Sequence, residues 1–106
     1  MLTRHYKIFI PESVKISLQN QVDYISIEQQ DSISASKWLD GDIEAIQSLS
    51  QFPERCPIAP ENYNFNKKSK LQIRHLIYKK SFRIVFVVVK NEVRILSAKH
   101  GAKFPL

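Results

Sequence analysis

The last third of the sequence decides the fold, and from residue 71 to residue 100 it reads LQIRHLIYKK SFRIVFVVVK NEVRILSAKH. It contains three runs rich in apolar and β-branched residues, at 71–78, 81–89 and 93–100. Such runs are typical of β-strands. The pairs Lys79-Lys80 and Asn91-Glu92 separate the runs, and two residues is the length of the tightest hairpin turns. The stretch therefore predicts three consecutive antiparallel strands.

Two-residue turns would fix which side chains share a face of this sheet. They place Leu76 opposite Arg83 in the first hairpin and Val85 opposite Ala98 in the second. Because successive residues of a strand point to opposite faces, the side chains sort into two sets. One predicted face is apolar and suits a core: Ile73, Ile77, Phe82, Ile84, Phe86, Val88, Val93 and Ile95. The other is basic and aromatic around an apolar centre, and we expect it to be the working surface: Arg74, Tyr78, Arg83, Arg94 and His100 around Leu76, Val85, Val87, Leu96 and Ala98.

The composition is that of an ordinary globular protein. With 106 residues, 43% of them hydrophobic and 25% charged, residues 1–106 suit one domain with a modest core. No stretch approaches the ~18 apolar residues of a membrane span. The first residues lack the apolar segment of a signal peptide, and a single cysteine excludes an internal disulfide bond. We therefore expect a cytoplasmic protein that does not bind membranes.

The net charge of +6 is distributed unevenly. Residues 1–66 hold five Lys or Arg against nine Asp or Glu, which leaves −4. Residues 67–106 hold eleven Lys or Arg against one Glu, which leaves +10. A strand half this basic should attract a polyanion or an acidic protein partner. The alternative is that Lys and Arg only keep an exposed sheet soluble.

The first half of the sequence predicts a short strand and two helices. Residues 6–10 alternate weakly and end at Pro11, which suits the first position of a helix. That helix should run to about Gln30, and a second, capped by Asp31 or Ser32, should end near residues 52–53. The expected apolar stripes are Val14, Leu18, Val22 and Ile25 in the first helix, and Ala35, Trp38, Leu39, Ile43, Ile46, Leu49 and Phe52 in the second.

The predicted element order is β-α-α-β-β-β, which makes an α+β domain. We expect the helical hairpin to pack on one face of a mainly antiparallel sheet. Gly41 lies inside the second helix, where it costs about 1 kcal/mol relative to alanine. We expect it to let the two helices approach each other closely.

The sequence has no spacing typical of a metal or cofactor site. The histidines lie far apart, Cys56 has no companion cysteine, and there is no glycine-rich phosphate loop. We therefore expect neither a metal nor a cofactor. Cys56 follows Arg55, which can lower a thiol pKa, but a lone cysteine is more often a small buried residue.

Arg74, Arg83 and His100 share the basic face in this register, and their chemistry allows two uses. Arginine offers a rigid fork of donors for phosphate, and histidine can move a proton near neutral pH. Together they could bind RNA and stabilise the charge that develops when a 2′-hydroxyl attacks its phosphodiester. Equally, they could meet acidic groups of a protein partner. The same register puts His75 on the helix-facing side in a packed role, and packing is also the commoner use of Tyr78.

Several blocks of the sequence resemble toxins of the RelE/ParE superfamily, in particular its ParE branch. They span nearly the whole chain: WLD at 38–40, IEAI at 43–46, LSQFPERCPIAPE at 49–61, IRHLIY at 73–78, FRIVF at 82–86 and VRILSAKHGAK at 93–103. Each block alone is weak, and their occurrence in this order is the specific feature. The resemblance implies the β-α-α-β-β-β fold derived above.

The resemblance also implies a small plasmid-stabilising toxin, encoded beside an antitoxin that keeps it silent and inhibiting growth when released. The antitoxin's C-terminal segment wraps around the toxin in such families, and the hetero-oligomer usually represses its own promoter. A basic toxin suits an acidic antitoxin, because complementary fields speed association. The residues expected to bind partners are Arg74, Tyr78, Arg83, Arg94, Lys99, His100 and Lys103.

The resemblance leaves the target open. RelE-like members cut mRNA in the ribosome with basic sheet residues and a tyrosine, or a histidine and a glutamate, near the chain end. ParE-like members poison DNA gyrase and lack these catalytic residues. No tyrosine follows Tyr78 here, so we favour a gyrase toxin that acts by binding and is not an enzyme. The alternatives are a ribosome-dependent endoribonuclease that uses Arg74, Arg83 and His100, and a relic that only binds its antitoxin.

Overall fold

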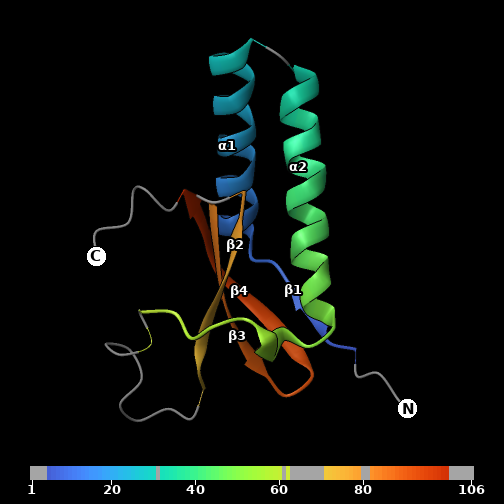
Figure 1. Cartoon of the computed structure of the whole chain (residues 1–106), viewed down its shortest axis with the longest axis vertical. Coiled ribbons are helices and arrows are strands. Elements are labelled where there is room, and N and C mark those ends of the chain that lie inside the picture. Colours follow the sequence, from blue (N-terminus) through green and yellow to red (C-terminus); the bar gives the residue numbers. More distant parts are fainter. Residues whose placement is uncertain (1–4, 31, 61, 63–70, 80–81, 101–106) are drawn as a thin grey trace.

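A computed structural model describes residues 5–30, 32–60, 62, 71–79 and 82–100 of the chain. Its helices and strands are, in chain order, β1 (Lys7–Phe9), α1 (Glu12–Gln29), α2 (Ser32–Gln47), β2 (Ile73–Tyr78), β3 (Phe82–Val89) and β4 (Glu92–His100) (Figure 1). Two short 3-10 turns, η1 (Ser48–Ser50) and η2 (Pro53–Arg55), follow α2. The predicted α+β class and element order are confirmed.

The four strands form one mixed sheet in the order β1-β4-β3-β2. The β2/β3 and β3/β4 pairs are antiparallel hairpins, and β1 lies parallel to β4 at one edge. Parallel neighbours cannot be joined by a tight turn. β1 and β4 are therefore neighbours in the sheet although both helices, β2 and β3 lie between them in the sequence.

The two helices pack side by side on one face of the sheet, as expected (Figure 1). Burial of apolar surface between these layers is the main source of stability. The buried residues of this main core are Val14, Leu18, Ile46, Leu49, Cys56, Phe82, Ile84, Phe86, Val93, Ile95 and Ala98. The two helices extend well beyond the ends of the strands at the side where α1 connects to α2 (Figure 1). Neither helix of the described residues is long and apolar enough to cross a membrane.

The buried side of α2 differs from the predicted stripe. Asp42 is fully buried, whereas Ile43 is 39% exposed. Asp42 lies midway between Trp38 and Ile46 at intervals of four, and residues four apart share a helix face. Phe52, expected at the end of the stripe, follows the helix and is exposed. Apolar periodicity located the helix but not all of its buried residues.

Gly41 brings α2 close to the sheet rather than to α1. A Cβ atom at this position would overlap the hydroxyl of Tyr78 on β2. That hydroxyl donates a hydrogen bond of 3.0 Å to the carbonyl oxygen of Trp38. The expectation of close helix–helix contact at Gly41 is therefore wrong, because Tyr78 fills the space that the missing side chain leaves.

The turn between β2 and β3 is one residue longer than predicted. Tyr78 pairs with Phe82, and Leu76 pairs with Ile84 rather than with Arg83, so three residues join the strands. A shift of one residue moves every side chain of a strand to the other face. Within β2, Arg74, Leu76 and Tyr78 therefore lie on the helix-covered face, and Ile73, His75 and Ile77 on the opposite one. The predicted placement of all six was wrong.

The turn between β3 and β4 has two residues, as predicted, but lies one position earlier. Val89 pairs with Glu92, so Lys90 and Asn91 form the turn. Lys90 has a φ of 57°, in the left-handed region, and hairpin turns of two residues commonly need such a φ. The expected turn at Asn91-Glu92 was therefore placed one residue too late in the chain.

A bulge in β4 keeps the strand matched to the core. The register shifts between Val85 and Phe86, and this shift leaves Leu96 without a partner. An extra residue reverses the alternation beyond it. As a result, both Ile95 and Ala98 belong to the main core, although Ala98 was expected on the opposite face.

Candidate functional site

The face of the sheet opposite the helices is the candidate functional site, and we call it the second face. Register places these residues on it: Lys7, Phe9, Ile73, His75, Ile77, Arg83, Val85, Val87, Val89, Glu92, Arg94, Ser97 and Lys99. Phe9, Arg94, Val87 and Ile73 form one row across all four strands, and Lys99, Arg83 and Ile77 form another across three. The second face thus joins apolar and basic side chains, as the sequence predicted, but with different members from β2 and from the end of β4. Ala98 and His100, both expected on this face, pair with Ile84 and Phe82 of the core face, because the bulge shifts the register by one residue.

The segment before β2 covers part of the second face. Ala59 packs in a small buried cluster with Ile73, Val85 and Val87. The backbone N–H of Ala59 donates to the carbonyl oxygen of Ile73 at 2.8 Å, and the N–H of His75 donates to that of Pro57 at 3.2 Å. These bonds satisfy the outer edge of β2, where unpaired groups would otherwise invite another strand. The outer edge of β2 is therefore occupied at Ile73 and His75.

The uncovered part of the second face exposes large apolar side chains beside cations. Phe9 is 52% exposed and Ile77 is 52% exposed. Leu96, the residue of the bulge that has no partner, is 45% exposed, and the register does not assign it to either face. Arg94 and Lys99 are exposed among them. Phe9 and Ile77 lie on the two opposite edge strands, β1 and β2, and in different rows, so they are separate exposed apolar side chains and not one contiguous patch.

Arg83 lies on the second face, where it was expected, but only 8% of it is exposed. Its Nε–H donates a hydrogen bond of 3.1 Å to Nδ1 of His75. The sequence placed His75 on the helix-facing side, and this was wrong because of the three-residue turn. A buried guanidinium needs hydrogen-bond partners to offset the loss of water, and His75 supplies one.

Arg74 serves the chain connection and not the second face. Its guanidinium donates to the carbonyl oxygens of Glu54 (3.2 Å) and Cys56 (2.6 Å), and to Oε1 of Gln72 (3.0 Å). Arg74 and Arg83 therefore lie on opposite faces, and the surface that was expected to unite them does not exist. Bonds from a charged donor are stronger than neutral ones, so Arg74 fastens the segment before β2 to the sheet.

Burial raises the pKa of the Cys56 thiol above its usual value, although Arg55 and Arg74 act in the opposite direction. A raised thiol pKa favours the unreactive protonated form. Cys56 is therefore a small buried residue, the commoner alternative in the sequence analysis. Among the described residues, no three His, Cys, Asp or Glu side chains gather closely enough to hold a metal ion.

Tyr78, expected as a binding residue, packs under α2 instead. Its ring lies edge-on to that of Trp38, with 5.6 Å between centroids. Burial raises the pKa of the Tyr78 phenol, with smaller contributions from the negative charges of Asp42 and Glu44. The hydroxyl therefore stays protonated and acts as a donor in the core.

The remaining expected binding residues divide between the second face and the chain end. Arg94 donates to the Glu92 carboxylate at 2.6 Å, and an exposed ion pair of this kind contributes little stability. The backbone of Lys99 pairs with Arg83, and that of His100 with Phe82. The side chain of His100 and the whole of residue 103 lie outside the described residues. Their expected roles stay predictions.

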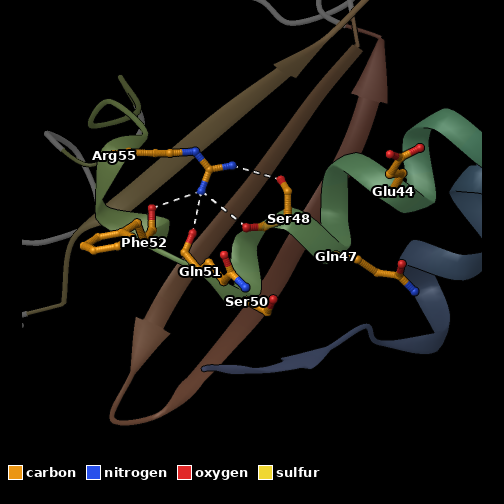
Figure 2. A pocket seen from close by; sticks show the side chains of 7 residues that line it. All are labelled: Glu44, Gln47, Ser48, Ser50, Gln51, Phe52 and Arg55. Carbon is orange, nitrogen blue, oxygen red and sulfur yellow. Dashed lines mark hydrogen bonds between the residues drawn. The ribbon is translucent and has the colours of Figure 1, made fainter. Parts of the chain in front are cut away.

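A pocket at the end of α2 is built around another structural arginine (Figure 2). Its lining residues are Glu44, Gln47, Ser48, Ser50, Gln51, Phe52 and Arg55. Arg55 donates to the carbonyl oxygens of Gln51 (2.7 Å), Phe52 (3.0 Å) and Ser48 (3.3 Å), and to the Ser48 hydroxyl (2.9 Å). Ser48 begins η1, and Gln51 and Phe52 follow it, so these contacts fasten the turn that connects α2 to η2. Arg55 therefore has a structural role in this turn.

Asp42 is a feature that the sequence analysis missed. Neither of its carboxylate oxygens has a hydrogen-bond partner among the described residues. Burial raises its pKa from an ordinary 3.8 to about 6, because a site without water disfavours the charged form. Its spacing of four from Trp38 and Ile46 was the signal that could have revealed it.

Comparison with known proteins bears on the fold. No family model and no curated protein matches the sequence. Among solved structures, a chain of the chromosomal ParDE TA system from P. aeruginosa matches with a TM-score of 0.70 and 16% sequence identity. The match covers 91% of this chain and 96% of that chain. The two proteins share a fold. At this identity the likeness concerns architecture, and function must be argued from surfaces.

Proposed function

We propose that this protein is the toxin of a type II toxin–antitoxin module, of the ParE kind. The observation that carries the proposal is the fold that it shares with a chain of the ParDE TA system over 91% of its length. The ordered sequence blocks that resemble the ParE branch support the same assignment. Its proposed action is cytoplasmic inhibition of DNA gyrase, which ceases when a cognate antitoxin binds.

The second face supports a partner that is both apolar and acidic. Phe9 and Ile77 offer apolar contact area, and Arg94 and Lys99 are exposed cations of the same face. An acidic segment with alternating apolar side chains complements both features. The proposed occupant is the C-terminal segment of an acidic antitoxin, in a hetero-oligomer.

The endoribonuclease alternative receives no support from the arrangement of its expected residues. Arg74 and Arg83 lie on opposite faces of the sheet, and Arg74 is bonded to backbone carbonyl oxygens. Two groups must reach the same phosphate to share in its cleavage. We therefore propose toxicity by binding and not by RNA cleavage.

The test of toxicity is induction of the protein without its neighbouring partner gene. We expect growth arrest with DNA breaks and an SOS response, while transcripts stay intact. Purified protein should inhibit supercoiling by purified gyrase. Normal growth at confirmed expression would overturn the toxin assignment, and cleaved transcripts with normal replication would overturn the gyrase target in favour of RNA cleavage.

The test of the interface uses one substitution on each side of the molecule. Ile77→Glu places an acid on the second face, where it should repel an acidic antitoxin and abolish rescue of growth. Ile27→Glu on α1 is the matched control, because Ile27 is also exposed, at 76%, but lies on a helix. Equal rescue of both toxic variants by the antitoxin would show that the second face is not the interface.

A further inference from the structure

Another pocket lies where the two helices meet the residue that follows β2. It has a volume of about 280 Å³, and the described residues that line it are Ile25, Ser34, Lys37, Trp38 and Lys79. These residues come from α1, from the first half of α2 and from the position directly after β2. A cavity of this size suits a small molecule with one ring, because the pockets of larger ligands begin at about 300 Å³.

The apolar part of this pocket is built from Ile25 and Trp38, whose side chains are both half-buried. Two aromatic rings hold the indole of Trp38 from the side of the core. The ring centroids of Tyr78 and Phe82 lie 5.6 Å and 4.9 Å from it, in edge-on geometry. A side chain fixed in this way loses little freedom when a ligand packs against it.

The charged part of the pocket consists of two lysines, Lys37 and Lys79, which are both exposed. Among the described residues, neither ammonium group forms an ion pair with an acid. The ammonium group of Lys79 lies 6.0 Å from the ring centroid of Tyr78, which itself contacts Trp38. Two cations beside one apolar surface favour a ligand that is both anionic and apolar.

We propose that this pocket binds a small apolar carboxylate. The ring or chain of the ligand contacts Trp38 and Ile25, and its carboxylate accepts from the ammonium groups of Lys37 and Lys79. The inference goes beyond the proposed function, because the pocket lies between the helices and the end of β2 and needs no toxic activity. It requires both parts of the ligand, so neither the charge alone nor the ring alone should be enough.

The test uses Trp38 as the reporter, because it is the one tryptophan of the chain. Phenylacetate is titrated into the full-length protein, and NMR follows the indole N–H signal. We expect a saturable shift that weakens as salt is added. Phenylacetamide has the same ring without the charge and should bind about tenfold more weakly. Acetate, which has the charge without the ring, should give no saturable shift over the same range of concentration.

Two substitutions remove the charges and leave the apolar surface intact. They are Lys37→Gln and Lys79→Asn, and asparagine suits the φ of 53° at position 79. We expect each to weaken phenylacetate binding about threefold, and both together about tenfold. The matched controls are Lys15→Gln, at an exposed lysine of α1, and Lys90→Asn, at an exposed turn residue with a φ of 57°. Both should bind as tightly as the unmodified protein.

The inference would be overturned if phenylacetate gave no saturable shift of the indole signal. Equal binding of phenylacetamide would also overturn it, as would full affinity in the double lysine variant. The dispersion of the amide signals shows whether each variant is folded, so lost binding is not confused with unfolding. None of these readouts involves growth arrest or gyrase, and the pocket and the proposed function can therefore fail independently.

Discussion

Asp42 should make the protein less stable as the pH rises. Its side chain is fully buried, and neither oxygen has a hydrogen-bond partner among the described residues. Burial raises the pKa of this carboxyl from 3.8 to about 6. In the unfolded chain water reaches the carboxyl, so the ordinary pKa returns. Ionisation of Asp42 therefore opposes folding.

The sign and size of the effect follow from these two pKa values. Below pH 3.8 the carboxyl is protonated in both states, and its contribution to stability is complete. Between 3.8 and about 6 the unfolded chain releases its proton first, so the free energy of unfolding falls. Above about 6 both states are ionised, and the loss reaches about 3 kcal/mol. This is a large part of the 5–15 kcal/mol that holds a typical domain together.

The assay is urea unfolding of the unmodified protein and of Asp42→Asn, which has nearly the same shape but no charge. We expect the variant's advantage to grow by about 2 kcal/mol between about pH 4.5 and about pH 7.5. Using the difference between the two proteins cancels the titration of other groups. Asp40→Asn, at an exposed position of α2, should follow the unmodified protein at every pH. A constant difference between the unmodified protein and Asp42→Asn would refute the reasoning.

Two packing predictions test the corrected register. Gly41→Ala should destabilise the protein by about 1–3 kcal/mol, because its methyl group meets the Tyr78 hydroxyl, and Tyr78→Phe should recover part of that loss in the double variant. Urea unfolding of the four proteins measures the coupling, and strictly additive losses would contradict the contact. Arg74→Ala should cost about 1–3 kcal/mol through its lost bonds to carbonyl oxygens, whereas Arg94→Ala should cost less than about 0.5 kcal/mol. Equal losses for the two arginines would show that Arg74 is not a structural clamp.

The architecture was predictable because it depends on periodicity. Residues such as Val14 and Leu18 indicate the buried face of a helix, and the apolar run at 81–89 indicates a strand. The burial of β3 on both faces was not predicted, because one of them was expected to be the working surface. Pairing of β3 with both its neighbours follows from the short gaps that flank it. An error of one residue in a turn does not change the element types or the order of the strands, because these depend on the pattern of many apolar residues.

The faces of the strands were less predictable because each depends on the length of one turn. Lys79 has a φ of 53°, and nothing in the pair Lys79-Lys80 announces that the turn takes a third residue. That residue transfers Arg74 to the helix side and brings His75 beside Arg83. The bulge at Leu96 also has no signal in the sequence from which it could have been predicted. One residue more or less in a turn exchanges the two faces of a strand. Strand propensity, which is averaged over many residues, does not reveal such a difference.

Charge counting also needed the structure before it could support a functional argument. The strand half carries a net +10, but Arg74 is bonded to carbonyl oxygens and Arg94 to a carboxylate. Arg83 is largely buried beside His75. Groups already bonded gain less from a new anion, since they must exchange one partner for another. The net charge of the strand half therefore overstates how many of its cations a new anion could use, because three of these arginines already have partners inside the chain.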